Sequence, residues 1–165
     1  MQLRETLMGA MAQGGPSAGI QICRDEAPRI ADAVSAKHGV ALGRIGVRTR
    51  QPTNQLDGWQ REVLEAWAAQ SVESVESVES APSQWAPHVR HDAGTSTLRW
   101  AKAIETEGIC LACHGSNISD STQAALDERY PEDEATGFAQ GSLRGLIWVE
   151  VPTAASAAPR RDAPF

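Results

Sequence analysis

The chain has 165 residues, of which 41% are hydrophobic and 22% charged, and its formal net charge is −6. These values are ordinary for a single globular domain with a buried core. The basic residues are scattered along the chain and do not form the basic face that nucleic-acid binding requires, so we expect no nucleic-acid partner. No apolar stretch approaches the roughly 20 residues of a transmembrane helix, so we expect no membrane span.

The N-terminal part of the chain has the pattern of two helices. Residues 1–13 indicate an amphipathic helix, in which leucines and methionines recur among polar residues. Gly14, Gly15 and Pro16 break it, and Pro16 is suited to open a second helix because its missing N–H is not needed there. Cys23 lies on the apolar face of that second helix. Pro28 predicts a kink or a restart just after it, since proline removes a backbone donor.

The next part of the chain predicts a strand followed by a helix. Val40 to Arg50 alternates in the manner of a strand, and a change of parity near Gly43 suggests a β-bulge. After a turn, Asp57 can cap a helix. The buried face of that helix is indicated by large apolar residues four positions apart: Trp59, Val63 and Trp67.

Residues 71–91 have the character of a variable surface loop, which opens with a Ser-Val-Glu repeat over residues 71–80. Strands are predicted from Thr95 to Ile104 and from Leu143 to Val151. Between them, Asp120 and Gln123 suggest a capping pair for a helix that ends near Tyr130. Residues 153–165 are rich in Ala and Pro and predict a disordered tail. The sum is an α+β fold, in which helices surround a small antiparallel sheet in one domain over residues 14–152.

One motif carries chemistry. Cys110-Leu111-Ala112-Cys113-His114 has the pattern of c-type haem attachment, in which two thiols reach the vinyl groups of one porphyrin and the imidazole lies under the iron. A zinc site would need four ligands, and no second Cys-x-x-Cys or His pair supplies them. A redox dithiol would belong to a βαβ pattern, which this region lacks. We therefore predict one covalently bound haem c per chain, attached through Cys110 and Cys113, with His114 as an iron ligand.

The haem motif also bears on location and on the third cysteine. Bacteria attach haem to this motif outside the cytoplasm, so we expect the protein to be periplasmic or otherwise exported. Residues 1–12 lack the unbroken apolar core of a signal peptide, so we expect the export signal to have been removed before residue 1. Cys23 is then the one cysteine not used for haem attachment, and an unpaired thiol in an exported protein needs a role. On the residues alone, Cys23 is either a small buried core residue or a ligand.

Further motifs occur in a fixed order along the chain. They are Gly19-Ile-Gln-Ile-Cys23, Arg44-Ile-Gly-Val-Arg48, the cysteine motif with Gly115, Arg129-Tyr-Pro-x-Asp133 and Gly141-x-Leu-Arg144-Gly145. Over about residues 14–152 this resembles the single-haem c-type cytochrome family with a PAS-like fold. The resemblance implies a PAS-like antiparallel sheet with helices around it, and His114 on one side of the iron. On the other side it implies an unusual cysteine ligand from the N-terminal helix, which carries over to Cys23.

Other polar residues are weaker candidates. Arg48, Arg50 and Arg144 could pair with haem propionates, because a guanidinium grips a carboxylate through two hydrogen bonds, or they could be exposed strand charges. The remaining histidines are not expected to bind iron. We expect His38 to cap the end of a helix, and His88 and His91 to be solvated surface residues.

These expectations leave several functions open. A thiolate ligand favours ferric iron, so ligation by His114 and Cys23 predicts a low reduction potential. With both axial positions filled, small substrates cannot reach the iron, which argues against an enzyme. An electron carrier would work with a redox partner protein or a small redox-active molecule, whereas a redox or gas sensor would exchange its sixth ligand. An enzyme acting on sulfur compounds is a weaker third reading. We expect electron transfer, because no output domain and no membrane anchor stand out in the sequence.

Overall fold

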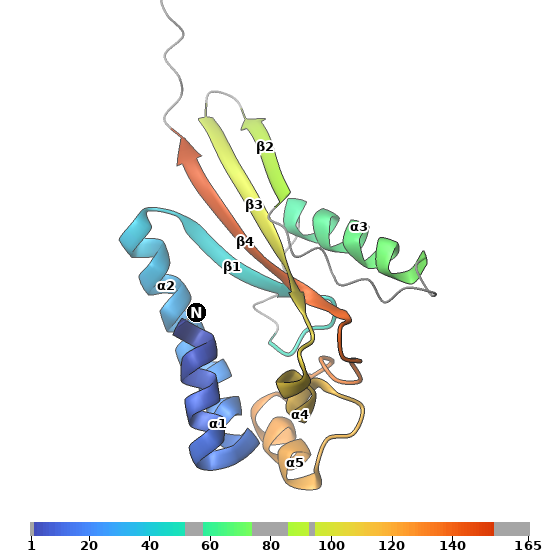
Figure 1. The fold of residues 1–165 in the computed structure, drawn as a ribbon. Helices are drawn as coiled ribbons and strands as arrows, with labels where there is room; N and C mark the ends of the chain where they lie inside the picture. Colours follow the sequence, from blue (N-terminus) through green and yellow to red (C-terminus); the bar gives the residue numbers. More distant parts are fainter. Residues whose placement is uncertain (1, 52–57, 74–85, 93–94, 154–165) are drawn as a thin grey trace, which may run out of the picture.

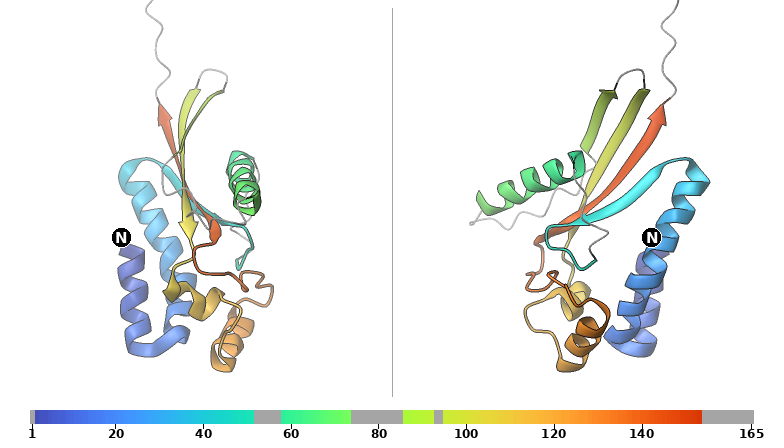
Figure 2. Two further views of the ribbon diagram at one scale, coloured as in Figure 1. Left: turned by 45° about the vertical axis from the view of Figure 1, so that its right-hand side comes forward. Right: turned by 180° about the vertical axis from the view of Figure 1, so that it is seen from behind.

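The computed structural model describes residues 2–51, 58–73, 86–92 and 95–153. At its centre is an antiparallel sheet of four strands in the order β1-β4-β3-β2: β1 (Ala41–Gly46), β2 (Ala86–Asp92), β3 (Thr95–Glu105) and β4 (Leu143–Thr153). Helices α1 (Gln2–Gln21) and α2 (Ala27–His38) lie on one side of the sheet and α3 (Trp59–Glu73) on the other (Figures 1 and 2). The short helix α4 (Leu111–His114) and α5 (Asp120–Arg129) lie beyond one end of the sheet. The predicted α+β class is confirmed.

Helix α1 consists of two segments separated by a reversal at Gly15. Gly15 has φ 66° and ψ −163°, which only glycine adopts readily, and Pro16 opens the second segment. The two segments run back along each other, and a Cβ on Gly19 would lie 2.8 Å from Cγ of Met11 (Figure 1). The predicted break is confirmed. In the described parts of the chain no helix, α1 included, has the length and apolar character needed to cross a membrane.

Cys23 lies in a π-helical turn, Ile22–Glu26, which joins α1 to α2. Pro28 follows in the first turn of α2, a position that tolerates its missing N–H. The predicted irregularity beside Pro28 is therefore confirmed. Such π-turns inside helices occur frequently at functional sites.

Strand β1 is shorter and more regular than predicted. It spans Ala41–Gly46 in place of residues 40–50, and its pairing with β4 is unbroken, so the predicted bulge near Gly43 is wrong. The apolar residues change parity because both faces of the strand are covered. Leu42 lines a cavity beside α2, whereas Ile45 is 1% exposed in the core on the α3 side.

The main core lies between the sheet and α3. The predicted buried face of α3 is confirmed, and Leu64 joins it. This face packs on side chains from three strands, β1, β3 and β4: Ile45, Ala101, Leu143 and Leu146. Burial contributes about 1.5–3 kcal/mol for each large apolar side chain, so this cluster holds α3 on the sheet. A second cluster of Ile20, Leu126 and Tyr130 joins α1 to α5.

Residues 86–92, predicted within a variable loop, form strand β2 instead. β2 pairs with β3 from Ala86↔Ala101 to Asp92↔Thr95, at the sheet edge opposite β1. The sequence pattern misses this strand because an edge strand needs one partner only and tolerates proline, here Pro87. Residues 71–73 of the repeat continue α3, whereas residues 74–80 and the predicted tail after residue 153 lie outside the described residues.

The cap of α5 differs by one residue from the prediction. Ser119, not Asp120, is the cap residue, and its Oγ accepts the Thr122 N–H at 3.3 Å. Gln123 donates to Asp127 instead of reaching back to the cap, so the predicted capping pair is wrong. The cap still directs α5 against the N-terminal helices, beside the cysteine motif.

Candidate functional site

The cysteine motif follows β3 closely. Gly108–Cys110 forms a 3₁₀ turn and Leu111–His114 the single helical turn α4. Residues three apart on a helical turn are neighbours, which suits two thiols that act together. Cys110 and Cys113 are partly buried, and both are free thiols. Gly115 ends the turn by donating to the Leu111 carbonyl at 3.0 Å, and a Cβ there would lie only 2.7 Å from that oxygen.

His114 is held in one tautomer. Its Nδ1 lies 2.7 Å from the carbonyl oxygen of Ala135. Because a carbonyl can only accept, Nδ1 carries the proton and Nε2 keeps a lone pair. Burial, followed by the nearby cations Arg50 and Arg144, lowers the pKa of His114 from 6.5 to about 3. The imidazole is therefore neutral near pH 7, and its Nε2 is in the state that a metal requires.

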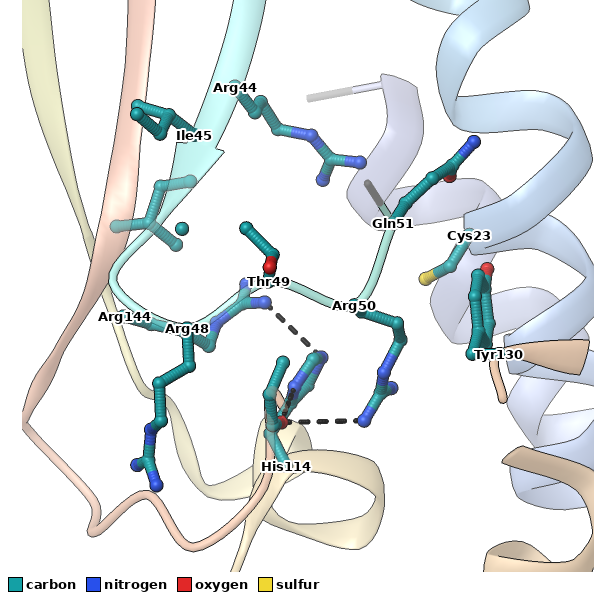
Figure 3. Close-up of a pocket in the computed structure, with 13 residues that line it drawn as sticks. Cys23, Arg44, Ile45, Arg48, Thr49, Arg50, Gln51, His114, Tyr130 and Arg144 are labelled. Atoms are coloured by element: carbon teal, nitrogen blue, oxygen red, sulfur yellow. Dashed lines mark hydrogen bonds between the residues drawn. The ribbon is translucent and has the colours of Figure 1, made fainter. Parts of the chain in front are cut away.

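Cys23 reaches the same cavity from the N-terminal helices. The side chains of Cys23 and His114 both line a cavity of about 100 Å³. In Figure 3 the sulfur of Cys23 points toward this cavity beside Tyr130, and His114 lies across it. The structure therefore brings together the two predicted axial ligands, one from the π-turn and one from α4.

A second, larger cavity of about 420 Å³ adjoins the first. The two share Cys23, Arg44 and Gln51 in their walls. The larger one lies between the N-terminal helices and the sheet, and most of its lining is apolar: Leu3, Ala27, Ile30, Val34, Leu42 and Ile147. The site thus combines an apolar space with a polar end near His114.

Two arginines bring positive charge to the polar end. Nη1 of Arg144 donates to Nε2 of His114 at 3.3 Å, but Nε of Arg144 is buried without a hydrogen-bond partner. Burial also lowers the pKa of Arg144, since its charge is poorly solvated. Arg44 of β1 lines both cavities and has no carboxylate partner within the described ranges. Partly buried guanidinium groups in this condition favour an anionic ligand.

Of these two, Arg144 was predicted from the sequence and Arg44 was not. Arg44 begins the Arg44-to-Arg48 motif and shares the parity of Leu42, so it faces the N-terminal helices. This shared parity was the sequence signal that could have identified Arg44 as a residue of the site. Arg44 was missed because the strand was predicted to change parity at Gly43.

The other predicted arginines have different surroundings. Arg48 is exposed, with Cζ 4.1 Å from the centroid of the Phe138 ring, and in Figure 3 its guanidinium points away from Cys23. A propionate contact for Arg48 stays a prediction. Arg50 is largely buried and pairs with Asp133 at 2.9 Å, so its charge is compensated within the protein.

The remaining histidines lie on other elements. His38 ends α2, where Gly39 with φ 64° forms the cap. His88 and His91 belong to β2 at the sheet edge opposite β1, and their side chains lie outside the described part of the structure. Within the described residues, no three His, Cys, Asp or Glu side chains gather as a site for a bare metal ion.

This donor set and cavity fit haem. Haem is a broad apolar ring with two carboxylates and an iron that takes a neutral imidazole and a thiolate. The apolar cavity suits the ring, and Arg44 and Arg144 suit the carboxylates. His114 Nε2 and Cys23 suit the iron. Because the guanidinium of Arg144 covers Nε2, it must turn aside before Nε2 can bind a metal.

Comparisons with known proteins agree with this fold. The model of the Tll0287-like family matches residues 2–152, so it includes the first helix. The crystal structure of the cyanobacterial heme-protein Tll0287 is similar with a TM-score of 0.62 and 23% sequence identity, over 94% of this chain and 91% of that chain. No curated protein matches. The structural likeness supports the fold, and the family match confirms the resemblance indicated by the sequence motifs.

Proposed function

The chain belongs to the Tll0287-like family, and from that premise we propose that it is an exported, single-haem c-type cytochrome that transfers electrons. The solved relative is described as a heme-protein, which supports haem as the cofactor. Cys110 and Cys113 would form thioether bonds with it. The observation that carries the proposal is the neutral His114 imidazole, which is fixed by Ala135 and lines the cavity, with the free thiol of Cys113 directly before it and that of Cys110 one helical turn earlier.

We assign the second axial position to Cys23. Its support is geometric, since Cys23 and His114 line one cavity from different elements. A thiolate there would stabilise ferric iron and lower the reduction potential. The same cavity wall includes Tyr130, whose pKa is raised by burial and then by Cys23.

Bound haem supplies one-electron chemistry between ferric and ferrous iron. The residues of the chain bind, orient and shield it. His114 is oriented by Ala135, Arg44 and Arg144 offer partners to the carboxylates, and the apolar cavity walls suit the ring. Electron transfer is favoured by surroundings that are already arranged and need little reorganisation, and the hydrogen bonding at His114 supports this function.

A sensor is the second candidate, and the π-turn at Cys23 favours it. Cys23 would be held less tightly by ferrous than by ferric iron, because ferrous iron carries one positive charge fewer. Because the π-turn interrupts the regular hydrogen bonding between α1 and α2, loss of the ligand could change its register and shift the N-terminal helices. Such a two-state element is what a sensor needs.

Intact mass tests the covalent haem. Protein expressed with an export signal should carry the mass of one haem after denaturation. Protein expressed without that signal should not, and neither should the Cys110→Ala/Cys113→Ala variant. Haem that extracts into acidified organic solvent from the unsubstituted protein would overturn covalent attachment.

Carbon monoxide binding separates the carrier from the sensor. A carrier with both axial ligands retained should bind no carbon monoxide after reduction by dithionite, and its voltammetry should be reversible at all scan rates. Rapid carbon monoxide binding with hysteretic voltammetry would instead establish ligand exchange and favour the sensor.

A further inference from the structure

The Arg50 guanidinium bonds to both sides of His114. Its Nη2 donates to the carbonyl of Cys113, the residue before His114, at 2.6 Å. It also reaches the carbonyl of Ala135 at 3.4 Å, which is the acceptor for His114 Nδ1 at 2.7 Å. The backbone and the ring of His114 are therefore tied to the same side chain, which comes from the segment after β1.

Asp133 completes this network. Its Oδ2 accepts Nε of Arg50 at 3.0 Å and Nη2 at 2.9 Å, and its Oδ1 accepts the N–H of Ala135 at 2.8 Å. The Arg50 and Asp133 side chains are only 11% and 7% exposed. A buried ion pair is tolerated when further hydrogen bonds satisfy it, and here those bonds end on Cys113 and Ala135.

We propose that Arg50 and Asp133 are positioning residues that hold the Ala135 carbonyl against His114 Nδ1, and thereby set the orientation and donor strength of His114 as an iron ligand. This inference rests on the proposed haem function and deepens it. The acceptor of the non-ligating nitrogen fixes the plane of a ligating imidazole and raises its basicity. Because the two charges compensate each other, this pair fixes the ring without adding a net charge of its own.

A pair that only stabilised the fold would behave differently. Its removal would lower the unfolding midpoint but leave the ligand geometry and redox equilibrium of the folded protein unchanged. Removal of a positioning pair must also change the EPR g-values and the midpoint potential of the iron. The sign of the potential shift must follow the charge that is left behind.

The test uses the haem-loaded protein with Arg50→Gln, Asp133→Asn or both. Arg50→Gln leaves a carboxylate unpaired and should favour ferric iron about tenfold, whereas Asp133→Asn leaves a cation and should favour ferrous iron about tenfold. The double variant restores neutrality, so its midpoint potential should return toward the original. Its low-spin EPR g-values should stay altered, and amide exchange across residues 133–138 should rise, because the Ala135 peptide is released.

Two further variants separate charge from geometry. Arg50→Lys keeps the charge but lacks the planar five-donor group that spans Asp133 and the two carbonyls, so it should keep the potential but not the g-values. The matched control is Arg99→Gln/Glu150→Gln, which removes a partly buried pair joined at 2.8 Å on β3 and β4, away from the residues that line both cavities, and should change neither signal. If the Gln or Asn variants do not fold, Arg50→Lys alone tests the inference, which altered g-values would support and unchanged g-values would overturn. Unchanged g-values, or potential shifts of the same sign in both single variants, would overturn the inference. Unsubstituted protein without covalent haem would instead overturn the proposed function.

Discussion

Protonation of His114 offers a quantitative test of its buried, neutral state. The pKa of His114 is about 3 in the folded chain and 6.5 ordinarily, chiefly because burial disfavours the charged imidazole. Between these values the unfolded chain binds a proton that the folded chain does not, so stability is lost as pH falls from about 6.5 toward about 3. Each pH unit in this window costs about 1.4 kcal/mol. His114 should therefore lower the free energy of unfolding by about 2 kcal/mol at pH 5, and by up to about 5 kcal/mol near pH 3.

Urea unfolding of the chain without haem measures this effect. The Cys110→Ala/Cys113→Ala protein is compared with the same protein carrying His114→Gln, between pH 7 and pH 5. Glutamine can donate to the Ala135 carbonyl but does not titrate, and the carboxylates common to both chains cancel in the difference. The His114 chain should lose about 2 kcal/mol more than the Gln chain over this range. Parallel pH profiles for the two chains would refute the buried, neutral imidazole.

Three further substitutions test the ligand, the charge and the packing of this site. Cys23→Ala should convert ferric iron from low to high spin, or to a replacement ligand, while haem stays bound; an unchanged ferric spectrum would exclude the thiolate. Arg144→Gln removes a buried cation beside His114 and should lower the midpoint potential by about 59 mV, a tenfold change for one electron; an unchanged potential would place the guanidinium far from the iron. Gly43→Val brings a Cβ to 2.6 Å from the Trp148 ring and should lower the free energy of unfolding in urea by about 1–3 kcal/mol; an unchanged free energy of unfolding would contradict this close packing.

Short-range features of this protein could be predicted because their causes are local. The reversal at Gly15 and the irregularity before Pro28 follow from the backbone freedom of glycine and the missing donor of proline. The apolar spacing of α3 likewise indicates its buried face without knowledge of the partner. The thiols and the imidazole of the cysteine motif occupy five consecutive residues, so their juxtaposition is a matter of chain geometry.

Most features that the sequence did not reveal depend on partners distant in the chain. Strand β2 exists because β3 offers it an edge, and β1 needs no bulge because helices lie on both of its faces. The one-residue difference in the α5 cap shows that even a local signal leaves a choice between adjacent serine and aspartate.

The site itself divides along the same line. The sequence by itself identified the cysteine motif as a candidate haem-attachment site and, through the family resemblance, Cys23 as a candidate iron ligand. Only the tertiary structure decided that Arg50 pairs with Asp133 and that Arg44 enters the cavity, and it also decided that the Ala135 carbonyl meets His114. Periodicity and spacing describe a residue relative to its chain neighbours, whereas burial, pairing and the pKa of His114 depend on groups that folding brings from other elements.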